Sequence, residues 1–136
     1  MSRLGPLKLK VMLFCGEVTA MGPGKAELLE AIEREGSISA AGRAMGMSYR
    51  RAWTLVDTMN RCWTQPLVKT SVGGGAGGGA QLTPFGEQVL RAYRVLEDQL
   101  MQCASDGPFH RFESDLLASP RPQEPDEGEK SAHGAA

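Results

Sequence analysis

The sequence predicts a mainly α-helical fold with one small β-hairpin. Apolar residues recur at helical spacing in several separate segments. A run of glycines lies between two short strand-like segments, and glycines and prolines mark the ends of the helical ones. A chain of 136 residues is long enough for one domain with a modest core and too short for two full domains.

The N-terminal part is predicted to form one strand and then one helix. Residues 7–14 begin by alternating apolar and basic side chains, which is the period of a half-buried strand. A Gly-Pro-Gly break precedes a helix over about residues 25–35, in which Leu28 and Leu29 belong to an apolar stripe. Gly36 suits the left-handed position that ends such a helix.

Residues 36–53 indicate two short helices joined by a tight turn. Ser37 is expected to cap the first helix, which runs to about residue 45 and carries several alanines. Small side chains there allow the second helix to cross closely. Gly46 supplies the positive φ of the turn, and Ser48 caps the second helix, predicted over residues 49–63.

The second of these helices has one face that is predicted to be buried. Ala52, Val56 and Met59 recur every three or four residues, Trp63 continues this stripe, and Trp53 lies beside it. An exposed tryptophan could stack on a nucleic-acid base. Because both tryptophans lie on or beside the buried stripe, we expect them to pack in the core instead.

A glycine-rich run separates the two strands of a predicted hairpin, residues 67–71 and 80–82. A phosphate-binding P-loop is excluded, since no lysine and helix follow the glycines. A flexible linker would join two domains, whereas both flanks here belong to one hairpin. We therefore interpret the run as a wing whose backbone can approach the minor groove or the phosphates of DNA. The wing glycines are Gly73, Gly74, Gly75, Gly77, Gly78 and Gly79.

A long helix is predicted over residues 84–104, with Thr83 as its cap and a proline at its first position. Its apolar stripe is longer than one neighbouring helix would cover, and it includes Val89, Tyr93, Leu96 and Leu100. This excess of apolar surface predicts a homodimer.

Strand, helix, helix-turn-helix, hairpin and long helix follow one another in the order of a winged helix-turn-helix domain. We expect this domain to span residues 1–105. Residues 106–118 are predicted to be weakly structured. Residues 119–136 are rich in proline, glutamate, glycine and serine, so a disordered tail is expected there.

The charges of the chain are unevenly distributed. The formal net charge is only −1, but residues 37–70 hold five cations and a single acid, a local charge of +4. A basic surface that coincides with a helix-turn-helix favours attraction to phosphates. The residues expected to contact double-stranded DNA are Ser37, Ser48, Tyr49, Arg50, Arg51, Thr54 and Lys69. Of these, Arg50 and Thr54 are assigned to bases, and Ser48, Tyr49 and Arg51 to phosphates.

Several other classes of protein are not supported by the sequence. The three cysteines are far apart and have no spacing typical of a metal site, so we expect no metal, no cofactor and a reducing cytoplasm. No signal peptide, membrane span or enzyme motif is found. The main alternative is a winged-helix interaction module that has lost DNA binding. The clustered arginines argue against it, because a retired DNA surface has no need of them.

The run from residue 36 to residue 86 resembles the N-terminal DNA-binding domain of ModE-type molybdate-responsive regulators, which are related to the LysR type. The matching pieces are GSISAAGRAMGMSYRRAW, the asparagine of VDTMNR, and QPLVKTSVGGGAGGGAQLTPFG. The resemblance implies a regulator of molybdenum-related genes. It also implies dimerisation through the first and last helices, with Leu28, Leu29, Val89, Tyr93, Leu96 and Leu100 in the interface.

Two departures from the family pattern change what is expected. Members of the family carry C-terminal oxyanion-binding domains, and the residues after the last predicted helix are too few to form them. We therefore expect the signal to come from a separate ligand-sensing partner and not from molybdate bound to this chain. The family wing also carries a lysine among its glycines, where Gly75 stands in this sequence. Loss of that charge removes about one phosphate contact.

Overall fold

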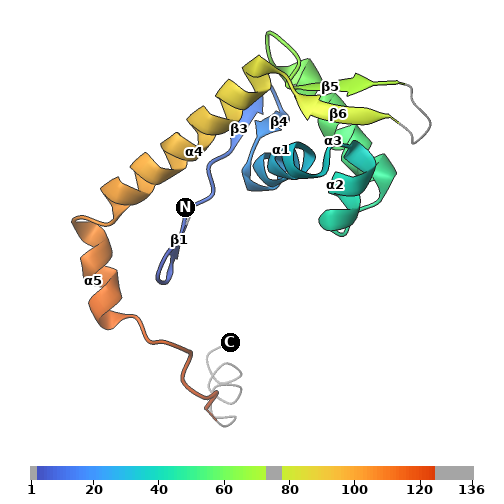
Figure 1. The fold of residues 1–136 in the computed structure, drawn as a ribbon. Helices are drawn as coiled ribbons and strands as arrows, with labels where there is room; N and C mark the ends of the chain where they lie inside the picture. The colour runs from blue at the N-terminus through green and yellow to red at the C-terminus, as the bar shows by residue number, and fades with distance from the viewer. Residues whose placement is uncertain (1–2, 73–77, 125–136) are drawn as a thin grey trace, which may run out of the picture. The chain divides into compact units, whose positions relative to one another are not determined.

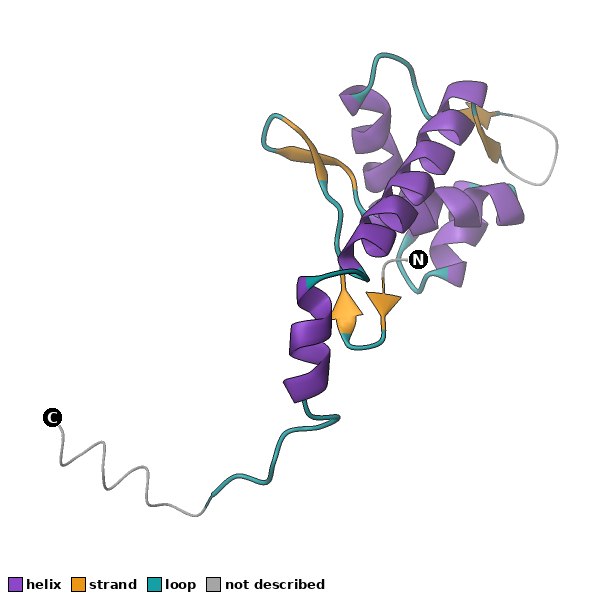
Figure 2. Ribbon diagram, turned by 90° about the vertical axis from the view of Figure 1, so that its left-hand side faces the viewer, coloured by secondary structure: helices purple, strands orange, loops and turns teal. Residues whose placement is uncertain are grey.

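The computed structural model describes residues 3–72 and 78–124 (Figure 1). The chain divides into two compact units, Met1–Ser105 and Asp106–Ala136. The first unit holds β1 (Arg3–Leu4), β2 (Leu7–Lys8), β3 (Leu13–Cys15), β4 (Val18–Met21), α1 (Pro23–Glu35), α2 (Ile38–Ala44), α3 (Tyr49–Cys62), β5 (Val68–Ser71), β6 (Gly79–Leu82) and α4 (Pro84–Ala104). Helices dominate and the described strands are confined to short antiparallel pairs (Figure 2), so the predicted fold class is confirmed.

The N-terminal region differs from the single strand predicted over residues 7–14. It forms two successive hairpins, β1–β2 and β3–β4. Each hairpin turns at a glycine in the left-handed region, Gly5 at φ 55° and Gly16 at φ 61°. These glycines lie on either side of residues 7–14 and turn each end of that segment back on a different partner. Leu7–Lys8 pairs with β1, Leu13–Cys15 pairs with β4, and residues 9–12 belong to neither strand, so the single-strand prediction is wrong.

The helix-turn-helix follows the prediction closely. Gly36 ends α1 with φ 80°, and its N–H bonds Ile32 O at 2.9 Å. Gly46 holds the turn between α2 and α3 at φ 69°. A Cβ on Gly42 would lie only 3.2 Å from the Cβ of Ala52, so small residues on both helices permit the close crossing.

The wing, defined here as the hairpin of β5, β6 and the glycine-rich run between them, is attached to two helices. Asn60 of α3 accepts hydrogen bonds from Leu67 N at 2.9 Å and Val68 N at 3.0 Å, and it donates to Val68 O at 3.0 Å. On the other strand, Ala80 N donates to Gly36 O at 2.8 Å. The wing is therefore fixed to both α1 and α3.

Thr83 joins the wing to α4. Its Oγ1 donates to Pro66 O at 2.8 Å and accepts a hydrogen bond from Gly86 N at 2.8 Å, which caps the helix. A Cβ on Gly86 would collide with the carbonyl group of Leu67. Glycine is therefore required where α4 passes the start of β5.

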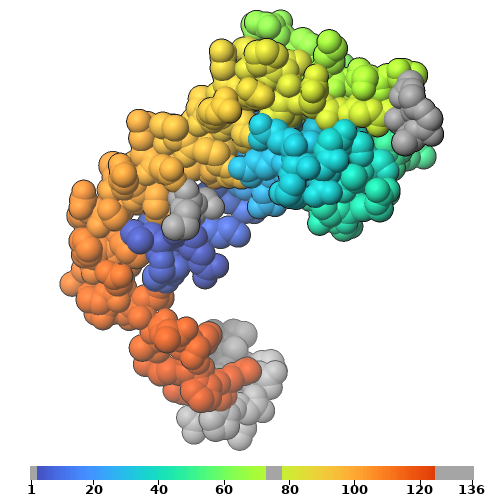
Figure 3. All heavy atoms as spheres, in the orientation of Figure 1, coloured from blue at the N-terminus to red at the C-terminus, as the bar shows by residue number. Residues whose placement is uncertain are grey.

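Helix α4 buries one side against the rest of the first unit. Tyr93 is almost fully buried, and its hydroxyl donates to Val11 O at 2.8 Å. Arg94 bonds Glu30 of α1 and the buried Glu97, with distances of 2.5 and 2.7 Å. In the space-filling view, α1 and α2 (cyan) lie against the atoms of β6 and the start of α4 (yellow) (Figure 3).

The second unit contains a regular helix, α5 (Pro108–Asp115), where the sequence predicted weak structure. Residues 119–124 have no regular structure, and the rest of the predicted tail, residues 125–136, lies outside the described part of the chain. None of the helices described has the length and the apolar character that crossing a membrane requires.

Candidate nucleic-acid interface

Two serines cap the helices of the helix-turn-helix. Ser37 Oγ accepts a hydrogen bond from Ala40 N at 3.0 Å, and Ser48 Oγ accepts one from Arg51 N at 3.1 Å. Each hydroxyl still has its own proton to donate to an acceptor such as a phosphate oxygen.

The start of α3 presents an exposed polar face. Tyr49, Arg50, Arg51 and Thr54 are all exposed there, and a shallow hollow is lined by the last three together with Ser48. Thr54 Oγ1 donates to the Arg50 carbonyl at 2.9 Å. The Thr54 hydroxyl is therefore left mainly as an acceptor in the position predicted to meet a base.

Four cations of the helix-turn-helix and the wing have no acidic partner in the part of the chain that the structure describes. Among the described residues, no carboxylate lies within ion-pair distance of Arg43, Arg50, Arg51 or Lys69. By contrast, carboxylates pair with Arg34, Arg61, Arg91, Arg94 and Arg111. Unpaired guanidinium groups at the start of an exposed helix form a surface suited to phosphates and to guanine edges.

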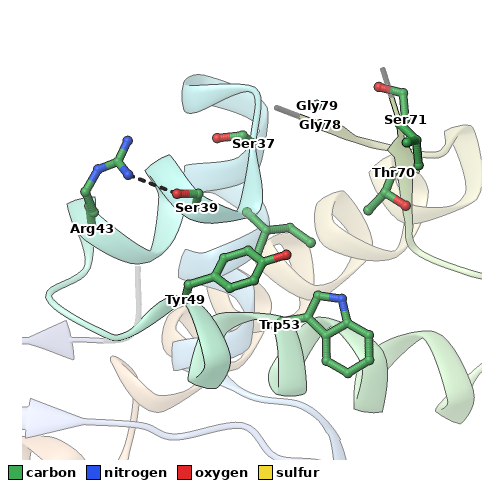
Figure 4. Close-up of a pocket in the computed structure, with 11 residues that line it drawn as sticks. Ser37, Ser39, Arg43, Tyr49, Trp53, Thr70, Ser71, Gly78 and Gly79 are labelled. Carbon is green, nitrogen blue, oxygen red and sulfur yellow. Dashed lines mark hydrogen bonds between the residues drawn. The ribbon is translucent and has the colours of Figure 1, made fainter. Parts of the chain in front are cut away.

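A cleft of about 520 Å³ separates this helix pair from the wing. Figure 4 shows Tyr49 and Trp53 projecting from α3 between the α2 side and the β5 side of the cleft. Lys69 does not line it. That side chain borders a second hollow on another side of the wing, next to Glu33 of α1.

The chain is similar in sequence to several curated proteins. No protein-family model matches the chain. The chain is 48% identical over 79 residues to the molybdenum transport protein ModE of Azotobacter vinelandii, covering 58% of this chain and 29% of that protein. It is 44% identical over 100 residues to the molybdenum-pterin-binding protein MopB of Rhodobacter capsulatus, covering 74% and 35% respectively.

A third relative is named for its function. Over 100 residues the chain is 37% identical to the DNA-binding transcriptional dual regulator ModE of Escherichia coli K12, covering 74% of this chain and 36% of the regulator. This chain is a ModE homologue. It spans about a third of the length of these curated relatives.

The residues predicted for DNA binding in this ModE homologue fall into three groups. Ser37, Tyr49, Gly78 and Gly79 line the cleft. Ser48, Arg50, Arg51 and Thr54 surround the hollow on α3. Lys69 lines neither of these sites but a further hollow, which it shares with Gly79. The remaining wing glycines, Gly73, Gly74, Gly75 and Gly77, lie outside the described residues.

Part of the predicted dimer surface needs correction. Leu28 and Leu29 have no exposed surface, and Tyr93 is buried against the N-terminal segment, so none of the three faces a second chain. These side chains complete the protein's own core, which a periodic pattern does not distinguish from an interface. Val89 and Leu96 are half-buried and Leu100 is exposed, so these three stay a prediction.

The sequence prediction for Trp53 was wrong. Its side chain is 48% exposed and lines the cleft, whereas Trp63 is half-buried and packs edge-on against Phe85. Trp53 lies about 100° around the helix from Ala52, outside the arc set by the buried stripe, and four residues after the exposed Tyr49. This angular position could have predicted the exposure of Trp53. The prediction relied instead on the large apolar side chain, which favours burial.

Proposed function

We propose that this chain is a homodimeric, DNA-binding transcriptional regulator of molybdenum-related genes. Helix α3 reads the major groove, and the glycine-rich wing approaches the minor groove or the phosphates. The observation that carries the proposal is the pair of exposed, unpaired arginines, Arg50 and Arg51, at the start of the second helix of a helix-turn-helix. Relatives named as transcriptional regulators support it.

Within this proposal the exposed residues of α3 have different tasks. Arg50 pairs with a base edge, because a guanidinium group can bond guanine O6 and N7 together. Thr54 accepts a hydrogen bond from a base. Ser48, Arg51 and Tyr49 bond phosphates and fix the position of the helix on the duplex.

The homodimer forms through α4. The flank of α4 beside its buried stripe carries accessible apolar surface, with Val89 and Leu96 half-buried and Leu100 40% exposed. A second copy covering this surface removes it from water. Sedimentation velocity tests this on the full chain: we expect a dimer for the native protein and a monomer for Leu100→Lys. If the native protein is still monomeric at a concentration of about 50 µM, well above a dissociation constant in the micromolar range, the dimer is rejected.

DNA binding is tested by fluorescence anisotropy with labelled genomic fragments over a range of salt concentrations. We expect saturable binding whose affinity falls steeply with salt. Arg50→Ala is expected to lose about 1–3 kcal/mol per half-site and to relax preference at one base pair. Arg61→Ala is the matched control, because Arg61 is paired with Asp57 toward the far end of α3.

The interaction-module alternative makes a different prediction for the same measurement. A folded chain that binds no fragment at low salt, or binds without salt dependence, contradicts the regulator and favours the module. No catalytic activity is part of either function.

A further inference from the structure

The cleft between α3 and the wing has a chemistry that the roles above leave unused. Its polar lining consists of one arginine and five hydroxyl-bearing side chains, among them Tyr49, and none of the lining residues is acidic. Two large aromatic side chains, Tyr49 and Trp53, complete it with 57% and 48% exposure. Hydroxyls and a cation beside bare aromatic rings suit a ligand that joins an anionic group to an apolar ring.

Arg43 is held ready for an anion on the α2 side of the cleft. Its Nη1 donates to Ser39 Oγ at 2.9 Å, which orients the guanidinium group (Figure 4). Among the described residues no carboxylate pairs with it. Its remaining N–H groups and the Ser39 hydroxyl proton are donors of the kind that phosphate oxygens accept.

Opposite Arg43, the wing side of the cleft offers hydroxyls and little bulk. Thr70 and Ser71 of β5 line it, and Gly78 and Gly79 form the facing part of the wing. A Cβ on Gly78 would lie 2.6 Å from the Ser71 carbonyl oxygen, so a side chain there would force the two strands apart. The wing therefore stays narrow beside the cleft.

Exposed Trp53 indicates what lies between these polar walls. A tryptophan left in water is costly, and large aromatic side chains are enriched where partners bind. On α3 it lies on the flank that faces the wing, not on the side opposite the core where Thr54 lies. A strand of DNA that passes between a helix in one groove and a wing in the next presents its backbone, not its bases, to that flank.

We propose that the cleft holds the sugar–phosphate backbone of one DNA strand, with Arg43 and Ser39 on a phosphate and Trp53 against the neighbouring deoxyribose. This inference rests on the proposed DNA binding. It assigns to Arg43 and Trp53 a contribution to affinity that does not depend on base sequence, in contrast to Arg50.

The phosphate contact is tested by coupling a protein change to a DNA change. A binding site is first selected from random duplexes with the native chain, and each phosphate is then replaced singly by an uncharged methylphosphonate. Arg43→Gln is expected to weaken binding to native DNA about tenfold per half-site. On the duplex neutralised at the contacted phosphate, the same change is expected to have no effect. Arg61→Gln is the control of equal charge.

Losses that are additive at every phosphate overturn the Arg43 contact. If the native chain selects no site at all, the proposed function fails and not this inference alone. If Arg43→Gln binds the selected site as tightly as the native chain does, the proposed DNA binding stands but the cleft does not hold the DNA backbone. The Arg43 and Arg61 side chains are both exposed, and circular dichroism verifies that the two variants fold.

The sugar contact is tested with Trp53→Ala and Trp53→Phe. We expect Trp53→Ala to weaken binding to all sequences by about tenfold, with base preference unchanged, and Trp53→Phe to keep most of the affinity. Replacing thymine by uracil across the site removes only methyl groups and is expected to have no effect that depends on Trp53. A loss on uracil that Trp53→Ala abolishes shows base reading and overturns the sugar contact.

A free nucleotide shares the chemistry of the backbone, so thymidine monophosphate is the last probe. The part of the tryptophan fluorescence that is absent from Trp53→Phe, and therefore comes from Trp53 and not from Trp63, is expected to be quenched by the selected duplex. The nucleotide at equal phosphate concentration is expected to leave it unchanged. Saturable quenching by the nucleotide alone assigns the cleft to a small ligand and refutes the proposal that a DNA strand occupies it.

Discussion

Replacing Asn60 by alanine is expected to loosen the wing from α3. The Asn60 side chain makes three hydrogen bonds to the backbone of Leu67 and Val68 at the start of β5, all between 2.9 and 3.0 Å. Leu67 and Val68 are buried, so their amide groups have little access to water once the side chain is removed.

The size of the effect follows from this geometry. Each such hydrogen bond contributes about 1 kcal/mol net, and an unsatisfied buried partner costs about 1–3 kcal/mol. With partial access of water at the half-buried Asn60, the three bonds together give a loss of about 2–4 kcal/mol in the free energy of unfolding. Asn60→Asp keeps the acceptor for both amides, but it replaces the donor to Val68 O by an oxygen that repels this carbonyl. Because two of the three hydrogen bonds persist, we expect a loss that is smaller than for alanine.

Urea denaturation at one fixed protein concentration measures both variants, because a dimer's stability depends on concentration. The order native, Asn60→Asp, Asn60→Ala is expected for the midpoint. Equal losses in the two variants, or a loss below about 0.5 kcal/mol for alanine, refute the view that this side chain fastens the wing.

Further predictions concern α4 and its neighbours. Burial, reinforced by the Glu97 carboxylate, raises the pKa of Tyr93 to about 12. The unfolded chain therefore ionises first between pH 10 and pH 12, and stability falls as the pH rises through that window. Tyr93→Phe is expected to flatten this fall in pH-dependent denaturation while costing about 1 kcal/mol at neutral pH; an unchanged slope contradicts it. Gly86→Ala is expected to lower the free energy of unfolding, measured by thermal denaturation, by about 3 kcal/mol or more, because the new Cβ meets the Leu67 carbonyl. Gly24 also lies in a helix, but a Cβ there meets open space, so Gly24→Ala is expected to raise the free energy of unfolding by about 0.5 kcal/mol. Similar effects of the two changes would count against the steric explanation.

The helical part of the fold was predictable because its signals are local. Ser37, Ser48 and Thr83 each cap the helix that the sequence assigned to them. Gly36 and Gly46 both adopt the positive φ expected of them. In each case the deciding interaction spans only a few residues, so no knowledge of the tertiary fold was needed.

The remaining features depend on neighbours that are distant in sequence. Tyr93 looked available for a partner chain until the structure placed Val11, 82 residues earlier, beside its hydroxyl. Trp53 looked like a core residue until the wing left an open cleft beside it. A periodic pattern finds an apolar face, but it does not tell which neighbour reaches that face.

Thr83 gives the molecule a mechanical junction. One hydroxyl ends the wing by bonding Pro66 O and begins α4 by capping it at Gly86 N. Thr83 is the single residue between the end of β6 at Leu82 and the start of α4 at Pro84, so a rotation of α4 moves β6 with it. In a dimer built on α4, the hydroxyl then acts as a pivot that transmits a change at the contact between subunits directly to the wing.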